Sequence, residues 1–98
     1  MNEPILIDPA VAELIPGFLG NCRRDICRIL DAVRANELEA ARRIAHRLQG
    51  AGGAFGFDQI SLHGASIVQA CRAGAAKTAT LESDRLLEFL DQVQVRYR

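Results

Sequence analysis

The fold is decided by residues 38–56, which read LEAARRIAHRLQGAGGAFG. Apolar or small residues recur there at alternating steps of three and four, at Leu38, Ala41, Ala45, Leu48, Gly52 and Phe55. That spacing is typical of a helix with one buried stripe and of the contact seam in a helix bundle. We therefore predict a helix here, opened by a capping box of Asn36 and Glu39 and closed by Gly56.

A short helix is expected near the start of the chain. Asp8 and Pro9 form a typical N-cap and first helical residue, and the helix should run to about Leu14. Pro16 and Gly17 are then expected to interrupt or kink it.

Three further apolar stripes with helical spacing extend over the rest of the chain. They comprise Phe18, Cys22, Ile26, Ile29 and Val33; Ile60, Gly64, Ile67 and Cys71; and Leu86, Leu90, Val93 and Tyr97, widened by Leu87 and Phe89. The first of these helices should end near Ala35 and the second at Gly74. No proline occurs after position 16, which favours long helices. The sequence thus predicts an all-α fold, an antiparallel four-helix bundle with a short extra N-terminal helix. The alternative is a three-helix bundle with a frayed N-terminal segment.

Length and composition narrow the possible classes of protein. The 98 residues suit one domain, which we place at 1–98. Twelve Lys and Arg balance twelve Asp and Glu, so the chain lacks the basic excess of a nucleic-acid-binding domain. No apolar run approaches the roughly 20 residues of a membrane span, and the start does not resemble a signal peptide. Three cysteines without a CxxC pair fit buried thiols in a cytoplasmic protein.

His46 is predicted to point into solvent. On a helical projection it lies about 130° from the centre of the buried stripe. One turn away lie Arg42, Arg43, Gln49 and Gly50, and two turns away lie Glu39 and Gly53. Together with Arg47, the neighbouring arginines should surround the ring with positive charge and stabilise a phosphoryl group on it.

Glycines cluster just after this histidine, at Gly50, Gly52, Gly53 and Gly56. Each glycine inside a helix costs about 1 kcal/mol relative to alanine, so the cluster needs a reason. One reading is that the helix ends at Gly50. Another is that Gly52 allows close helix packing. A third is that bare backbone lets another macromolecule approach His46.

The run of Ala45, His46, Leu48, Gly50, Phe55, Gly56 and Ile60 resembles the signature of the histidine-containing phosphotransfer (HPt) domain, A-H-x-L-K-G followed by a small-residue stretch, an apolar residue and Gly. The resemblance implies that His46 accepts a phosphoryl group from a receiver-domain aspartate and passes it to another receiver. It implies a phosphocarrier that is not an enzyme and does not phosphorylate itself. The implied partners are response-regulator receiver domains and a hybrid histidine kinase, with Mg²⁺ supplied by the receiver and no cofactor on this chain.

One position departs from that signature. The family usually has Lys three residues after the histidine, where this chain has Gln49. We expect Arg42, Arg43 or Arg47 to supply the missing charge, and Gly50 and Gly53 to extend the surface beside the ring. The departure also supports an alternative, an HPt-like interaction module that binds a receiver or kinase without being phosphorylated.

The second histidine, His63, is expected to have a structural role. His63 flanks the stripe of its helix and should be partly buried and hydrogen-bonded. His46 and His63 lack third and fourth ligands at suitable spacing, so no metal site is predicted. No carboxylate pair or nucleophile–base pair converges on His46, which argues against an acid–base or hydrolytic enzyme. A neutral domain is expected to be a monomer.

Overall fold

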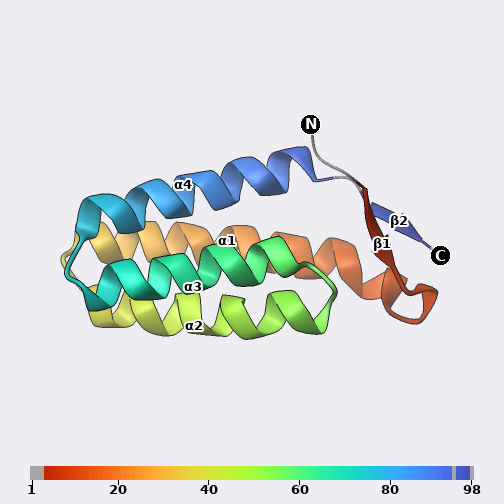
Figure 1. The fold of residues 1–98 in the computed structure, drawn as a ribbon, viewed down its shortest axis with the longest axis horizontal. Coiled ribbons are helices and arrows are strands. Elements are labelled where there is room, and N and C mark those ends of the chain that lie inside the picture. The colour runs from red at the N-terminus through yellow and green to blue at the C-terminus, as the bar shows by residue number, and fades with distance from the viewer. Residues whose placement is uncertain (1–3, 94, 98) are drawn as a thin grey trace.

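Four helices form an antiparallel bundle in the computed structural model, which describes residues 4–93 and 95–97 (Figure 1). The elements in chain order are strand β1 (Ile5–Ile7), the 3₁₀ helix η1 (Pro9–Leu14), helices α1 (Ile15–Arg34), α2 (Leu38–Ala54), α3 (Asp58–Arg72) and α4 (Ala76–Gln92), and strand β2 (Val95–Tyr97). The predicted four-helix bundle with a short N-terminal helix is confirmed, and the three-helix alternative is wrong.

The N-terminal helix begins as predicted but is not interrupted where expected. The Asp8 carboxylate caps η1 by accepting a hydrogen bond from the backbone N–H of Ala10 at 3.0 Å. Pro16 does not interrupt the helical segment. It lies in the first turn of α1, and η1 continues directly into that helix at Ile15. A proline fits there because the first-turn N–H groups of a helix have no intrahelical partner.

Helices α1, α2 and α3 end in the same backbone arrangement, each with one residue in the left-handed conformation. These residues are Asn36 (φ 59°), Gly56 (φ 84°) and Gly74 (φ 70°). In each case two backbone N–H groups bond back to the last turn; after α2, for example, Phe57 N–H bonds to Gly52 O at 2.7 Å. This is the Schellman motif, so the predicted stops at Gly56 and Gly74 are confirmed.

The predicted capping box at the start of α2 is wrong. Asn36 terminates α1 through bonds from Asn36 N–H to Val33 O and from Glu37 N–H to Ala32 O. The N-cap of α2 is Glu37, which makes no side-chain capping bond. Asparagine tolerates the left-handed conformation better than most residues, and the tight reversal between α1 and α2 requires that conformation.

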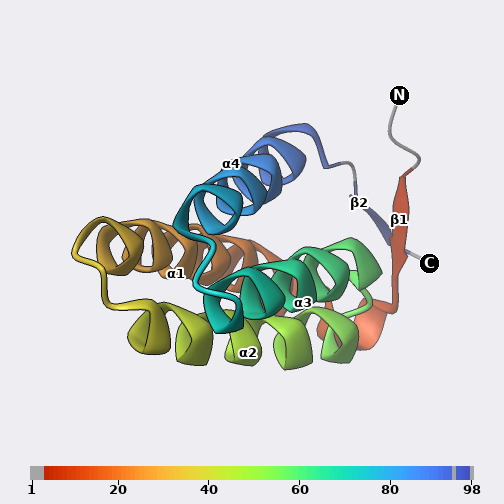
Figure 2. The same ribbon diagram turned by 60° about the vertical axis from the view of Figure 1, so that its left-hand side comes forward.

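The C-terminal segment also differs from the prediction. Helix α4 ends at Gln92, and Val93 is extended (φ −64°, ψ 134°). Strand β2 then pairs in parallel with β1, with Ile5 opposite Val95 and Leu6 opposite Arg96. The last helical stripe therefore stops at Leu90, and Val93 and Tyr97 lie beyond the helix. Figures 1 and 2 show the strand pair at one end of the bundle, where β1 and β2 lie side by side.

The buried stripes meet in one hydrophobic core, in which three phenylalanines pack together. Phe18 of α1 stacks on Phe55 with ring centroids 4.4 Å apart and lies 5.5 Å from Phe57. All three cysteines are free thiols; the predicted burial is confirmed for Cys22 and Cys71 and is wrong for Cys27, which is exposed. Burial, with a smaller contribution from the charge of Asp25, raises the pKa of Cys22 to about 12. No helix within 4–93 and 95–97 is long and apolar enough to span a bilayer.

The most extensive helix–helix contact among the described residues joins α2 and α3, and two glycines make it close. A Cβ atom on Gly52 would lie 2.7 Å from the backbone nitrogen of Ser61. One on Gly64 would lie 2.9 Å from the backbone nitrogen of Gln49 and 3.1 Å from Ala45 O. The Ser61 hydroxyl also donates a 2.6 Å hydrogen bond to the carbonyl of Gln49. Helix α2 continues through Gly50 to Ala54, so the suggestion that it ends at Gly50 is wrong.

Replacing Gly52 by alanine should destabilise the protein, because the added methyl group meets backbone atoms that cannot turn aside. We expect Gly52→Ala to lower the free energy of unfolding in urea by about 1–3 kcal/mol, the usual cost of overpacking. The matched control is Gly20→Ala in α1, where nothing lies within 4 Å of the added atom. That control should raise the free energy of unfolding by up to about 1 kcal/mol through helix propensity. Equal stabilisation by both substitutions would show that the two helices are not in close contact.

Candidate functional site

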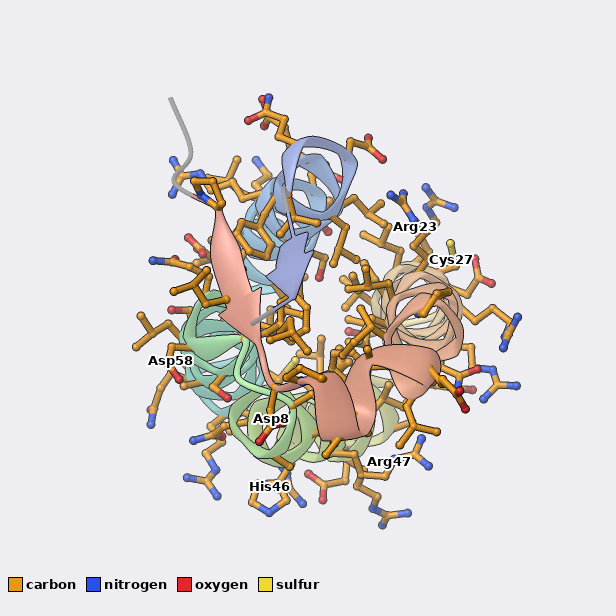
Figure 3. All side chains as sticks on the ribbon, turned by 90° about the vertical axis from the view of Figure 1, so that its right-hand side faces the viewer. Asp8, Arg23, Cys27, His46, Arg47 and Asp58 are labelled. Atoms are coloured by element: carbon orange, nitrogen blue, oxygen red, sulfur yellow. The ribbon has the colours of Figure 1, made fainter. Side chains whose placement is uncertain are left out.

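His46 lies on the outer side of α2, as predicted. Its neighbours Ala45 and Leu48 are buried in the core, whereas His46 itself is exposed. Figure 3, viewed along the bundle, shows the imidazole projecting away from the other helices. Because the Gly52 and Gly64 contact fixes which side of α2 faces α3, it also fixes the outward direction of His46.

A carboxylate holds two of the arginines beside His46. Arg42 makes a bidentate contact with Glu39. Its Nε donates a hydrogen bond to Oε2 at 2.9 Å, and its Nη2 donates one to Oε1 at 2.6 Å. Arg43 makes only a longer ion pair, with its Nε 3.7 Å from the same Oε1. The side chain of Arg42 is 23% exposed and that of Arg43 is 72% exposed. Glu39 thus holds Arg42 tightly and Arg43 more loosely.

The arginines near Glu39 lower the pKa of its carboxyl group. The hydrogen bond from Arg42 lowers the pKa of the Glu39 carboxyl more than any other contact. Burial opposes this shift, and the charges of Arg42, Arg43 and Arg72, each with a smaller effect than burial, lower the pKa further. The same hydrogen bond raises the pKa of Arg42. Arg72 belongs to α3, so the charges that act on Glu39 come from two helices. Sequence analysis placed Arg42 and Arg43 beside His46 but missed Arg72, because no sequence spacing relates it to α2.

Arg47 lies on the other side of the ring. Among the described residues it has no hydrogen-bond or ion-pair partner, and it borders two concave surfaces. One also includes Arg43, Ile44 and His46. The other lies between α1 and α2 and includes Asp25. In Figure 3, Arg47 extends from the outer surface of α2 on the side nearer α1.

The remaining predicted residues lie on the C-terminal side of His46. Gln49 is half-buried, and Gly50 and Gly53 are exposed. Nothing lies within 4 Å of where a Cβ on Gly50 would be, and a Cβ on Gly53 would make only an ordinary contact. Gly52 is therefore required by packing within the bundle, whereas Gly50 and Gly53 are not. The bundle itself gives no reason for glycine at these two exposed helical positions.

His63 lies between α3 and α4. The side chain is 23% exposed, and its Nδ1 lies 3.7 Å from Oε2 of Glu82, which Arg85 also contacts. Its ring centroid is 6.3 Å from that of Phe89. The predicted partial burial is confirmed, although Glu82 is beyond hydrogen-bond distance. No group of three or more potential metal ligands occurs in the described part of the chain.

Comparison with known families gives one match. The sequence model described as "Hpt domain" matches residues 13–96, which include all four helices and both histidines. Comparisons with curated proteins and with solved structures each gave no match.

The pairing of Arg42 with Glu39 is directly testable. Arg42→Gln should raise the pKa of the Glu39 carboxyl toward its ordinary value, because the substitution removes the hydrogen bond that lowers it most. Because folding lowers this pKa, the pair stabilises the protein above the ordinary carboxyl pKa, and the effect is lost as pH falls through the lowered value. Carboxyl carbon NMR over an acid titration measures the shift. Arg34→Gln, which removes an exposed pair with Asp31, is the control. An unchanged pKa in Arg42→Gln would contradict the geometry.

Proposed function

The chain belongs to the Hpt domain family, whose members are phosphocarriers in phosphorelays and not kinases, and we propose that His46 is its phosphoacceptor. In this proposal His46 accepts a phosphoryl group from the aspartyl phosphate of one receiver domain and passes it to the aspartate of another. The protein acts as a cytoplasmic monomer, and its partners are response-regulator receivers and a hybrid histidine kinase.

The observation that carries the proposal is the contrast between the two histidines. The sequence has only two, and the exposed one lies on the outer side of α2 among arginines. The other is largely buried between α3 and α4 beside Glu82. A phosphoryl donor on another protein needs a ring that it can approach in line, and His46 meets that requirement.

The chemistry needs little from the chain beyond this ring. A neutral imidazole nitrogen attacks phosphorus, the N–P bond forms, and the P–O bond to the receiver aspartate breaks so that the carboxylate leaves with the bonding electrons. The return step reverses these changes with the carboxylate of the second receiver as nucleophile. Arg42, Arg43 and Arg47 stabilise the phosphoryl oxygens by charge, and the Gln49 amide can donate a hydrogen bond. The Mg²⁺ that the transfer needs is bound by the receiver.

We propose that Gly50 and Gly53 allow a receiver domain to approach His46 closely. Both are exposed on the same side of α2 as His46, and neither is required by packing within the bundle. Without side chains there, a receiver can bring its phosphorylated aspartate close to the imidazole. The contact is expected to be weak, because each transfer must be followed by release.

Gln49 supports the second candidate, an interaction module that binds a receiver or kinase without carrying phosphate. The position is neutral and half-buried in this chain, whereas the resembling signature has a lysine there. If the surrounding arginines did not replace that charge, binding would persist while phosphorylation was lost.

Phosphoryl transfer from a panel of phosphorylated receiver domains distinguishes the two candidates. We expect an acid-labile, base-stable label on the wild-type protein and none on His46→Gln. Because the side chain is exposed, the substitution should change the free energy of unfolding by less than about 0.5 kcal/mol. His63→Gln is the matched control and should retain the label.

Receiver binding without any label on a folded wild-type protein would instead favour the interaction module. Equal labelling of wild type and His46→Gln would exclude His46 as the acceptor.

A further inference from the structure

We propose that Glu39 is an internal counter-anion that competes with phosphorylated His46 for the guanidinium groups of Arg42 and Arg43. This inference rests on the proposed function and adds a positioning residue to it. In the unphosphorylated protein the carboxylate holds both arginines beside the ring. In the phosphorylated protein two anions share these cations, so Glu39 makes the phosphohistidine less stable than it would otherwise be.

The first support is the geometry of the pairing. Glu39 receives two hydrogen bonds from Arg42, at 2.9 and 2.6 Å, and an ion pair from Arg43 at 3.7 Å. The carboxylate therefore lies between two arginines that precede His46 by four and three residues. Glu39 itself lies two helical turns before the histidine, on nearly the same side of α2.

The second support is the direction in which helical side chains lean. Side chains on a helix tilt toward its N-terminus, so each covers the turn that precedes its own Cα. The imidazole of His46 thus leans toward the turn that holds Arg42 and Arg43. His46 also borders the same concave surface as Arg42 and Arg43, so a phosphoryl group on the ring would lie on the surface that these two arginines line.

The third support is the balance of charge. A phosphoryl group carries roughly −1.5 to −2 at neutral pH, more than a single carboxylate. Arg43 is the arginine free to turn toward it, because its contact with Glu39 is longer and its side chain is more exposed than that of Arg42. Glu39 is ionised at neutral pH, as an ordinary carboxyl group is, and can therefore compete for these cations.

This arrangement explains how the site provides a cation for the phosphoryl group although Gln49 is uncharged. In the HPt signature, a lysine one turn after the histidine supplies a cation. In this chain Arg43, one turn before His46, supplies it. Glu39 then sets how strongly that cation acts, because it binds Arg43 whenever the ring carries no phosphoryl group.

Removing the charge of Glu39 without changing its shape tests the proposal. A receiver that labels His46 is mixed with wild-type protein or Glu39→Gln, and the ratio of phosphorylated protein to phosphorylated receiver is measured at equilibrium. This ratio reports the stability of the phosphohistidine independently of docking rates. We expect Glu39→Gln to raise it about two- to fivefold, the range expected from one exposed ion pair.

The matched control is Glu37→Gln, which removes the same charge near the start of α2 at an exposed residue with no ion-pair partner among the described residues. It should leave the ratio near the wild-type value. Glu39→Gln should also have no effect once Arg42 and Arg43 are both replaced by Gln, which a purely structural role of Glu39 would not predict.

An unchanged ratio in Glu39→Gln, or an equal rise in Glu37→Gln, would overturn the role of Glu39 while leaving His46 as the acceptor. Absence of label on His46 from every receiver would overturn the proposed function itself, and this inference with it. The two failures are therefore distinguishable.

Discussion

The close approach of α2 and α3 is the constraint on which the rest of the structure depends. Gly52 and Gly64 leave no room for a side chain between the two backbones, and Ser61 joins the helices by a hydrogen bond to Gln49. This contact fixes the rotation of α2 about its own axis. Once α2 cannot rotate, Ala45 and Leu48 face the core and His46 faces solvent. The exposure of the candidate phosphoacceptor thus follows from backbone packing on the opposite side of the helix.

Charge on the outer side of α2 is organised around one carboxylate. Surface ion pairs add little stability because water and salt screen them, so the Glu39 cluster contributes little to holding the bundle together. Its effect is local, since it determines where two guanidinium groups lie relative to an exposed imidazole. The buried side and the outer side of α2 therefore affect His46 in different ways. Helix packing sets the direction of the ring, and the Glu39 cluster sets the electrostatic field around it.

The sequence predicted the features that depend on local periodicity. The apolar stripes of the four helices as far as Leu90, the exposure of His46 and the stops at Gly56 and Gly74 all follow from helical spacing or from the conformational freedom of glycine. Whether Gly52 reflected close packing or the end of a helix could not be decided from α2 alone, because its contact, Ser61, lies on another helix.

The features that were missed depend on segments distant in sequence or on competition between local motifs. Strands β1 and β2 are three residues each and pair only with one another, so neither gives a strong signal by itself. Asn36 can either begin one helix or end the preceding one, and the short reversal between α1 and α2 selects the second role. The charge of Arg72 acts on Glu39 only because α3 packs on α2.

The most direct test of this account is to identify which ring carries the phosphoryl group. Phosphorus-31 and nitrogen-15 NMR of the labelled protein reports the imidazole nitrogen to which phosphorus is bonded. The account predicts a single N–P bond, on His46, with the ring of His63 unchanged. Phosphorus on His63, or on a carboxylate instead of a histidine, would contradict it.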